Sequence, residues 1–536
     1  MSRLLLIYPP AVKPCEPPLG LACLLGELAA RGIEASAIDA NLEACLHLLA
    51  EDGSTEVPRR NGFRALAYLR SPGAAESFPR YVTAVRRLDR ALSVLRGATG
   101  EERVTLGDYV HGGYSPFSPA ALEAVSAGAV PTLFSGYYRD SLLPRVVELS
   151  PRTIGLSVNF RHQVLPAFEL AGMLKRALPG VRIVGGGGMF SSWGRTLRES
   201  SLRLPAFDAI VTGAGEATLA RLTAGDGWDE GPVMEGGDAV RFAPDFGFAR
   251  LGEYLSPVPV LPVTASRGCY WRRCAFCPEA ATPTHGYACI EAARFPALLL
   301  SLSERYGVRH FHLTDNAIPV NVLRAIAGRA DDLSRLRWHG FVRFERALAD
   351  PALAAALARS GCRMLQLGLE SGSQRVLDRL KKGTHLEDAS AILANLSRAG
   401  IATYVYVMLG MPGETEADAE ATRAFLEAHA GAIGFLNVAL MNLPRDSAFL
   451  DAPEEHGIRD ARLYSEDEPL GLYRSFASAN GWSRAEARRF LSKRMLGTPA
   501  IRAIVNRTPP LFTSNHAFLF APGSGGDYSP GGATGR

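Results

Sequence analysis

Short apolar runs alternate with helical patterns along most of this 536-residue chain, and this alternation constrains the fold more than any other feature. Residues 3–8 (RLLLIY) form an apolar run, and residues 19–31 carry apolar side chains at helical spacing up to Gly32. Such strand–helix–strand repeats are typical of a parallel sheet covered by crossover helices. The fold class is therefore predicted to be α/β, and the length predicts more than one domain.

The first domain is predicted to span residues 1–225 as a doubly wound, Rossmann-like unit. Its strands are expected at residues 3–8, 34–39, 153–158, 181–184 and 209–211. A mostly helical stretch broken by Gly and Pro, at about 51–148, is interpreted as an insertion. Residues 226–262 are less regular and are predicted to be a linker.

Alternation resumes in residues 263–445, which are predicted to form a partial or full β/α barrel with functional residues at the carboxyl ends of its strands. These strands are expected at residues 311–314, 338–342, 364–369, 404–409 and 434–440. Residues 446–521 are predicted to be helical, with the apolar segment 508–520 packing beneath the barrel rather than closing its mouth. The Gly/Ser/Pro-rich residues 522–536 are predicted to be a disordered tail.

Composition and charge exclude several classes of protein. Lys and Arg exceed Asp and Glu by 58 to 54, and a net charge of +4 gives no strong reason to expect nucleic acid or an anionic membrane as partner. No apolar run is long enough to span a membrane, and the apolar run at the start of the chain is too short for the core of a secretory signal. Eight cysteines are too sparse for a disulfide framework. We therefore expect a cytoplasmic protein that binds neither nucleic acid nor membrane.

Three of the cysteines, Cys269, Cys274 and Cys277, lie within nine positions of one another. Three thiolates on one loop can hold three irons of a [4Fe–4S] cluster and leave the fourth iron open to an outside ligand. The alternative is structural zinc, which takes four ligands. His285 or Cys289 could supply the fourth, but the paired spacing of a zinc ribbon is absent. The spacing thus favours an iron–sulfur cluster with an open iron.

The cysteine loop and several segments after it resemble the radical S-adenosylmethionine (SAM) superfamily, specifically its cobalamin-binding branch. These segments are SRGC at the start of the loop, Phe276 before its last cysteine, HLTDN at 312–316, LGLESGS at 367–373 and VMLGMPGET at 407–415. Four residues, rather than the usual three, separate the first two cysteines, a departure that a flexible loop accommodates. The resemblance covers most of residues 1–445.

The resemblance implies that Cys269, Cys274 and Cys277 ligate a [4Fe–4S] cluster whose open iron binds SAM. Further SAM contacts that it implies are Phe276 near adenine, Asp315 or Asn316 near the methionine end, Glu370 and Ser371 near the ribose or amino group, and Met408 to Pro412, with Gly410, near adenine. Alternatives from the residues alone stay open: a strand-end cap for Asp315 and Asn316, an ion pair for Glu370 and a plain turn for Gly410.

Polar and glycine-rich segments follow the strands of the first domain, at the edge where doubly wound sheets bind ligands. Residues 17–41 and GAGE at 213–216 resemble the cobalamin-binding domain of the same branch. The cobalamin contacts that this implies are Pro9, Pro10, Ser157, Asn159, Gly185, Gly186, Gly187, Gly213, Gly215 and Glu216. The alternative is four ordinary strand-to-helix turns. His162 lies in NFRHQ rather than in the DxHxxG motif, so we expect cobalamin without a histidine ligand to cobalt.

The resemblance implies a methyltransferase that places a methyl group on an unactivated carbon through a 5′-deoxyadenosyl radical and methylcobalamin. The implied partners are a small-molecule or peptide substrate and an external low-potential electron donor such as flavodoxin or ferredoxin. Two other functions remain open. One is a cobalamin-dependent radical SAM enzyme that rearranges or cyclises its substrate without methyl transfer. The other is a zinc-stabilised module that binds cobalamin or a metabolite.

Overall fold

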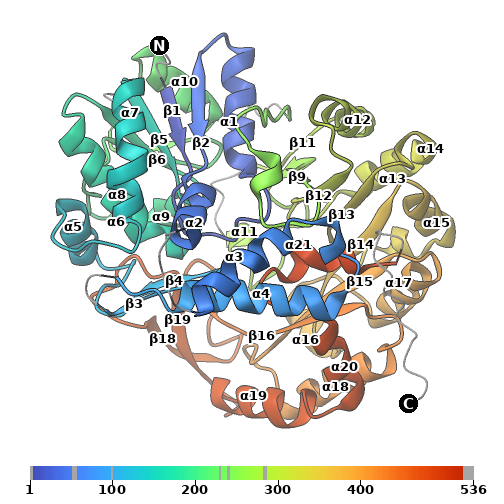
Figure 1. The fold of residues 1–536 in the computed structure, drawn as a ribbon. Helices are drawn as coiled ribbons and strands as arrows, with labels where there is room; N and C mark the ends of the chain where they lie inside the picture. Colours follow the sequence, from blue (N-terminus) through green and yellow to red (C-terminus); the bar gives the residue numbers. More distant parts are fainter. Residues whose placement is uncertain are drawn as a thin grey trace. The chain divides into compact units, whose positions relative to one another are not determined.

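The computed structural model describes residues 4–50, 57–97, 100–228, 231–237, 242–281 and 286–522. Two compact units make up the chain (Figure 1). The first comprises Met1–Pro72, Arg80–Pro259 and Ser465–Gly471, and the second comprises Gly73–Pro79, Val260–Tyr464 and Leu472–Arg536. The predicted tail, apart from its first residue, and His285 lie outside the described residues. Within those residues, no helix is long and apolar enough to cross a membrane.

The first unit contains a six-stranded parallel sheet in the order β2-β1-β5-β6-β7-β8. Its strands are β1 (Leu4–Ile7), β2 (Ala35–Ile38), β5 (Thr153–Ser157), β6 (Arg182–Gly186), β7 (Ala209–Thr212) and β8 (Val233–Glu235). Every residue of β1 is buried, as expected for a strand covered on both faces. Leu4 and Leu6 pack in one cluster with residues of α1 (Leu19–Ala30) and α10 (Glu216–Ala224).

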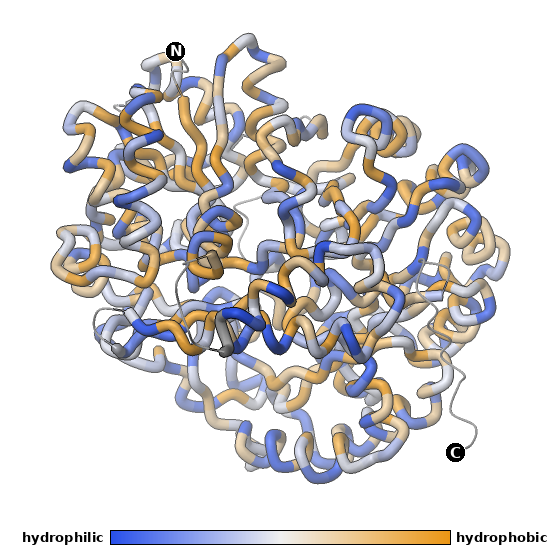
Figure 2. The backbone as a smooth tube through the Cα atoms, viewed as in Figure 1, coloured by the Kyte–Doolittle hydropathy of each residue, from blue (hydrophilic) through white to orange (hydrophobic). Residues whose placement is uncertain are grey.

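The five strands predicted for this unit are confirmed, whereas β8 was missed. It lies in the segment predicted to be a linker, so that part of the prediction is wrong. Only three residues form β8, and they pair with β7 from Ile210↔Val233 to Thr212↔Glu235. A strand this short carries too few apolar positions for a periodic signal. Figure 2 shows hydrophobic colouring along the first strands and mixed colouring on the helices around them.

The predicted insertion is mostly helical, with α3 (Val57–Leu69), α4 (Phe78–Ser93), α5 (Pro119–Ala127) and α7 (Leu143–Leu149) around a hairpin of β3 (Glu102–Val104) and β4 (Tyr109–His111). Helix α5 packs tightly against α8 (Val164–Ala177). A Cβ atom on Gly172 would lie 1.9 Å from the Ser126 carbonyl oxygen, so only glycine permits this approach. The insertion is thereby joined to the sheet's own crossover helix.

The second unit contains a six-stranded parallel sheet in the order β16-β15-β14-β13-β12-β9. Its strands are β9 (Val260–Val263), β12 (His310–Leu313), β13 (Arg337–Val342), β14 (Cys362–Glu370), β15 (Ala402–Leu409) and β16 (Phe435–Leu440). Among the described residues the two end strands do not pair, so the barrel is partial. The five predicted strands are confirmed. Strand β9 falls at the end of the predicted linker, which is a second correction to that segment.

Residues 446–521 are not helical throughout, contrary to the prediction. They include β18 (Ile458–Leu463) and β19 (Tyr473–Ser478), which form an antiparallel sheet with β17 (Leu443–Pro444). The two longer strands, IRDARL and YRSFAS, carry charged and small residues and have mostly exposed or half-buried side chains. They lack the alternation of apolar residues that predicts a strand. The helices of this region are α19 (Arg484–Phe490), α20 (Pro499–Arg507) and α21 (Thr513–Ala517).

One short segment of this region, Ser465–Gly471, belongs to the first unit although β18 and β19 on either side belong to the second. Its Leu470 carbonyl accepts a hydrogen bond from the indole N–H of Trp193 at 2.8 Å. Trp193 lies in α9 (Gly188–Glu199) and is among the largest fully buried side chains. The segment thus completes the core of a unit whose sheet ends more than 200 positions earlier.

The apolar segment 508–520 packs beneath the second sheet, as predicted. Phe518 stacks on His339 with ring centroids 4.2 Å apart and lies 6.1 Å from the ring of His310. His310 is the first residue of β12, so the contact lies at the amino end of that strand.

Candidate cofactor site

The three cysteines lie on one loop between β10 (Ser266–Arg267) and α11 (Pro278–Ala281), directly after β9. The Cys277 amide donates a hydrogen bond to the Cys274 carbonyl at 3.1 Å, and this turn brings the last two cysteines together. The pKa of Cys277 is raised to about 11, mainly by burial, with smaller contributions from the charges of Cys274 and Cys269 and an opposing hydrogen bond from the Glu279 backbone. The three cysteines thus lie on one short loop, with a turn joining the last two.

Two buried cations stand beside the middle cysteine. The Arg343 guanidinium, just after β13, donates to the Cys274 sulfur at 3.8 Å and lies 4.2 Å from the ring centre of Trp271. Burial raises the pKa of the Cys274 thiol, while the charges of Lys382 and Arg343 oppose that rise. A [4Fe–4S] cluster is held by thiolates, which such cations stabilise, so this donor set fits the predicted cluster.

The zinc alternative gains no fourth ligand from the described residues. Cys289 lies in β11 (Ala288–Cys289), where its backbone pairs with Ser266 and its thiol interacts with Tyr287. His285 is outside the described residues. Within them, no three His, Cys, Asp or Glu side chains are placed to hold a single metal ion.

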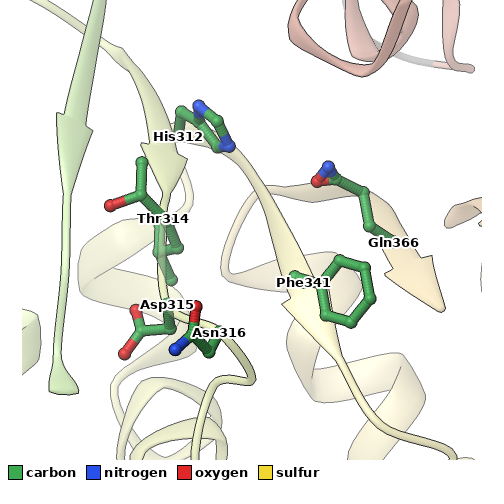
Figure 3. A pocket seen from close by; sticks show the side chains of 7 residues that line it. His312, Thr314, Asp315, Asn316, Phe341 and Gln366 are labelled. Atoms are coloured by element: carbon green, nitrogen blue, oxygen red, sulfur yellow. The ribbon is translucent and has the colours of Figure 1, made fainter. Parts of the chain in front are cut away.

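Asp315 and Asn316, predicted near the methionine end of SAM, follow β12 and differ in their surroundings. The buried Asp315 carboxylate accepts hydrogen bonds from the Ala265 amide at 3.1 Å and the Ser266 hydroxyl at 2.5 Å. It therefore fastens the end of β12 to the chain entering the cysteine loop, which is the strand-end alternative. Asn316 is exposed. Both residues line a cavity of about 390 Å³ (Figure 3).

Glu370 forms a buried ion pair that the sequence left open as an alternative. Its carboxylate lies 2.7 Å from the Lys382 ammonium, and the two side chains are 8% and 6% exposed. Glu370 has a φ of +67°, at a point where the register of β14 shifts against β15. The Lys382 ammonium also lies 5.6 Å from the ring centre of Phe276, a cation–π distance. Lys382, missed by the sequence analysis, thus links two of the predicted SAM residues.

The Ser371 hydroxyl is used within the turn that follows β14. It lies 3.1 Å from the Thr422 hydroxyl and accepts a hydrogen bond from the Ser373 amide at 3.1 Å. These contacts position the backbone beside Glu370. A role for Ser371 in binding SAM stays a prediction.

The segment Met408 to Pro412 ends β15 and lies against the cysteine loop. Met408 and Met411 belong to one apolar cluster with Ala275 and Phe276. Gly410 has a φ of +77°, and its amide and that of Met411 donate to the same carboxylate oxygen of Glu414, at 2.5 and 3.2 Å. The structure thus shows a turn at Gly410, and this turn places Met408 beside the apolar cluster that contains Phe276.

Glu414 predicts a measurable pH dependence of stability. It is fully buried, and burial raises its pKa from 4.5 to about 7. Because the folded protein holds this proton more tightly than the unfolded chain, the free energy of unfolding should fall as pH rises from about 4.5 to about 7, by up to about 3 kcal/mol. Urea unfolding at several pH values should show this slope in the wild type and lose it in Glu414→Gln.

Glu416, exposed at the start of α18 (Glu416–Ala428), provides the matched control. Glu416→Gln should keep the wild-type slope, because its carboxylate is solvated in both states. An identical slope in the wild type and in Glu414→Gln would contradict the prediction.

The residues predicted to contact cobalamin gather at the carboxyl edge of the first sheet. Gln163 donates to the Pro9 carbonyl at 2.7 Å, which joins the ends of β1 and β5. The Asn159 side chain donates to the Ser157 hydroxyl at 3.2 Å and accepts from the Gly188 amide at 2.9 Å, which joins β5 and β6. The remaining predicted residues, Pro10, Gly185, Gly186, Gly187, Gly213, Gly215 and Glu216, lie at or just after the ends of β1, β6 and β7.

The glycines at the end of β6 and just after it differ in the space around them, beginning with Gly186. A Cβ atom placed there would meet its nearest neighbour, the Val211 carbonyl oxygen, only at 3.7 Å. Gly187 has a φ of +104°, and a Cβ atom on it would lie 2.5 Å from the Val158 carbonyl oxygen. Glycine is therefore required by the backbone at position 187, whereas at position 186 a Cβ atom would make only an ordinary van der Waals contact.

A side-chain cluster that the sequence analysis missed lies beside this edge. His162 Nδ1 lies 3.0 Å from an oxygen of Asp108, and the Arg161 guanidinium lies 2.8 Å from the other oxygen. Burial alone would raise the pKa of Asp108, but the His162 hydrogen bond and the Arg161 charge lower it overall. Asp108 lies in the β3–β4 hairpin, 54 positions before His162, so no local sequence motif predicts the pair.

Comparisons with known proteins agree with this site. Residues 263–426 match the family model of the Radical SAM superfamily. "Uncharacterized methyltransferase PH0819" of Pyrococcus horikoshii is 24% identical over 311 residues, which cover 52% of this chain and 65% of the relative. "Bacteriochlorophyllide d C-12(1)-methyltransferase" of Chlorobaculum tepidum is 28% identical over 197 residues, which cover 34% of this chain and 41% of the relative. The chain thus spans less than two thirds of either relative.

Two solved structures share the fold over nearly the whole chain. The radical SAM methyltransferase TsrM from Kitasatospora setae, with tryptophan substrate and a SAM analogue bound, has a TM-score of 0.57 at 18% identity and covers 94% of this chain and 90% of its own. The cobalamin-dependent SAM radical enzyme OxsB, with aqua-cobalamin and SAM bound, has a TM-score of 0.60 at 15% identity and covers 92% and 67%.

The second unit therefore contains a radical SAM domain, and the chain has the fold of cobalamin-dependent radical SAM enzymes. Its named relatives include methyltransferases, and a radical SAM methyltransferase is among the solved structures that share its fold. The predicted α/β fold class is confirmed, and the match of residues 263–426 agrees with the predicted resemblance to the radical SAM superfamily. The predicted cofactors, a [4Fe–4S] cluster, SAM and cobalamin, are those that the similar solved structures hold.

Proposed function

We propose that this protein is a cobalamin-dependent radical SAM methyltransferase that methylates an unactivated carbon of a small molecule or peptide. The observation that carries the proposal is the loop of Cys269, Cys274 and Cys277 after the first barrel strand, with the buried Arg343 beside its middle sulfur. The doubly wound unit with its glycine-lined edge supports the cobalamin half of the proposal.

Several residues of the second unit would hold the cofactors. Cys269, Cys274 and Cys277 would bind the cluster, and the cations of Arg343 and Lys382 would stabilise the thiolate charge. Phe276 and Met408 present an apolar surface suited to a flat base. When bound, the cluster with SAM supplies radical chemistry, and cobalamin supplies a methyl group.

Residues on either side of this surface would orient SAM. The exposed Asn316 offers an amide at the mouth of the 390 Å³ cavity. The Lys382–Glu370 pair fixes the strand end opposite. In the first unit, the edge formed by Pro9, Ser157 and the glycines after β6 would bind cobalamin, and no histidine ligand to cobalt is proposed because His162 lies in NFRHQ rather than in the DxHxxG motif. An external low-potential donor such as flavodoxin or ferredoxin would supply the electron.

Product analysis tests the proposal. Protein reconstituted without oxygen should contain about four irons and four sulfides per chain, bind cobalamin, and form both S-adenosylhomocysteine and 5′-deoxyadenosine from SAM with a low-potential reductant and candidate substrates. 5′-Deoxyadenosine alone would favour the rearrangement enzyme instead. Zinc without sulfide would favour the binding module. If neither nucleoside forms with any candidate substrate, the proposal is contradicted.

A further inference from the structure

The cavity of about 390 Å³ is a widely open hollow at the carboxyl end of β12, lined by side chains of β12, β13 and β14 and by the residues that follow β12. Asp315 and Asn316 lie at its outer end, after the strand (Figure 3). His312, Phe341 and Gln366 lie farther back along β12, β13 and β14, and their side chains face the same space. The inner part of the cavity is therefore lined by residues that no predicted SAM contact uses.

The inner lining is aromatic and firmly held. The His312 ring stacks on His339 with centroids 4.4 Å apart, and His339 in turn stacks on Phe518. Phe341 lies 5.6 Å from the Tyr406 ring. Each ring that faces the cavity is thus supported from behind by another ring. Rigid aromatic walls favour a flat, largely apolar ligand.

One polar group in this lining lacks a hydrogen-bond donor. Gln366 is 5% exposed, and its side chain donates a hydrogen bond to the Tyr406 hydroxyl. Within the described part of the chain, its Oε1 oxygen accepts no hydrogen bond. Buried acceptors in proteins are nearly always satisfied, so an unpaired one at a cavity wall is a natural place for a ligand N–H or O–H.

The charges around the cavity restrict the ligand further. The described residues that line it include no Lys or Arg, and their one imidazole, His312, is stacked on His339, so an anionic group would find no permanent cation here. Its one carboxylate, Asp315, already accepts hydrogen bonds from Ala265 and Ser266 and is not free to pair with a ligand cation. Transfer of a charged group into such surroundings is costly.

We propose that the inner part of this cavity binds the substrate, and that the part of the substrate that enters is a flat, uncharged ring system whose N–H or O–H donates to Gln366 Oε1. The inference rests on the proposed function, because it assigns the substrate class for that same site. Gln366 and Phe341 are then specificity-determining residues: the first selects the donor and the second the flat shape.

Matched probes test this with reconstituted protein, without SAM or reductant. 2-Naphthol carries an O–H donor, 2-methoxynaphthalene lacks it, 2-naphthoate is an anion and N-methylquinolinium is a cation. Isothermal titration should show that 2-naphthol binds roughly fivefold tighter than its methyl ether, the value of about one hydrogen bond, and that both ions bind more weakly still.

Variants locate the effect. Gln366→Leu should lower 2-naphthol affinity roughly fivefold and abolish its advantage over the ether. Phe341→Leu should weaken both neutral probes while keeping that advantage. Gln374→Leu makes the same substitution in α16 (Gln374–Arg379), outside the cavity lining, and should change neither affinity nor preference. Circular dichroism verifies folding, and Phe341→Leu keeps the test decisive if Gln366→Leu does not fold.

Equal binding of the two neutral probes, tighter binding of either ion, or an unchanged preference in Gln366→Leu would overturn the inference. Because no turnover is measured, these outcomes are separate from those of the proposed function. Donor-selective binding by a protein that forms neither nucleoside would leave the pocket assignment standing and remove the methyltransferase. Formation of both nucleosides without donor-selective binding would support the methyltransferase and remove the pocket assignment.

Discussion

Cys274→Ala should abolish the iron–sulfur cluster and reduce SAM cleavage to the assay background. Three irons require three protein sulfurs, and Cys274 is the most buried of the trio, with Arg343 donating to its sulfur. Without this sulfur the buried Arg343 guanidinium would lose one acceptor and keep its ion pair with Glu345 at 3.0 Å, so the main loss should be the cluster ligand rather than the fold. Iron and sulfide content, visible absorbance and 5′-deoxyadenosine formation measure the loss.

Cys289→Ala is the matched control for this experiment. This variant removes the same sulfur atom from Cys289 in β11, 15 positions farther along the chain. Cys289 is one of the two residues, with His285, that could supply the fourth ligand in the zinc alternative. Iron and sulfide should stay at wild-type levels in this variant. Loss of metal in Cys289→Ala, or retention of the cluster in Cys274→Ala, would show that the assigned ligand set is wrong.

Lys382→Met should lower the free energy of unfolding by about 3–5 kcal/mol, the usual cost of removing one partner from a buried ion pair. Glu370 would keep a carboxylate that is 8% exposed and has lost its cation. Urea unfolding followed by circular dichroism measures the change. The double variant Lys382→Met/Glu370→Gln should recover most of the loss, because it removes the unpaired charge as well.

The exposed pair of Arg329 and Asp332 offers the comparison. Both side chains are about half exposed, and Arg329→Met should cost at most about 1 kcal/mol. If Lys382→Met costs no more than Arg329→Met, the Lys382–Glu370 pair does not stabilise the carboxyl end of β14. The predicted role of this pair in orienting SAM would then lose its structural basis.

The sequence predicted the two sheets because their strands are buried on both faces and therefore read as continuous apolar runs. RLLLIY and TIGLSV are examples, and each corresponds to a strand in the structure. The strands that it missed are of another kind. Strand β8 is three residues long, and β18 and β19 are exposed antiparallel strands rich in charged residues. Their positions depend on partners rather than on a pattern of their own.

The residues of the candidate site likewise fall into two groups, those that the sequence predicted and those that it missed. Residues on short motifs, such as the cysteines and the turn at Gly410, could be found because their chemistry and their spacing are local. Arg343 and Lys382 could not, because they meet the cysteine loop only through the folded sheet: Arg343 is 69 positions from Cys274. The contacts also show what the motif residues do, since Asp315 and Glu370 hold neighbouring segments in place through hydrogen bonds and an ion pair.

The contact between Trp193 and Leu470 sets a condition on the order of assembly during translation. An amino-terminal fragment ending at Pro259 would contain the whole first sheet yet leave the buried indole without its acceptor. The ribosome must therefore synthesise nearly nine tenths of the polypeptide, up to Leu470, before the first unit can complete its core. A gene truncated between the two sheets, made to produce the first unit alone, would lack a segment that completes the core of that unit.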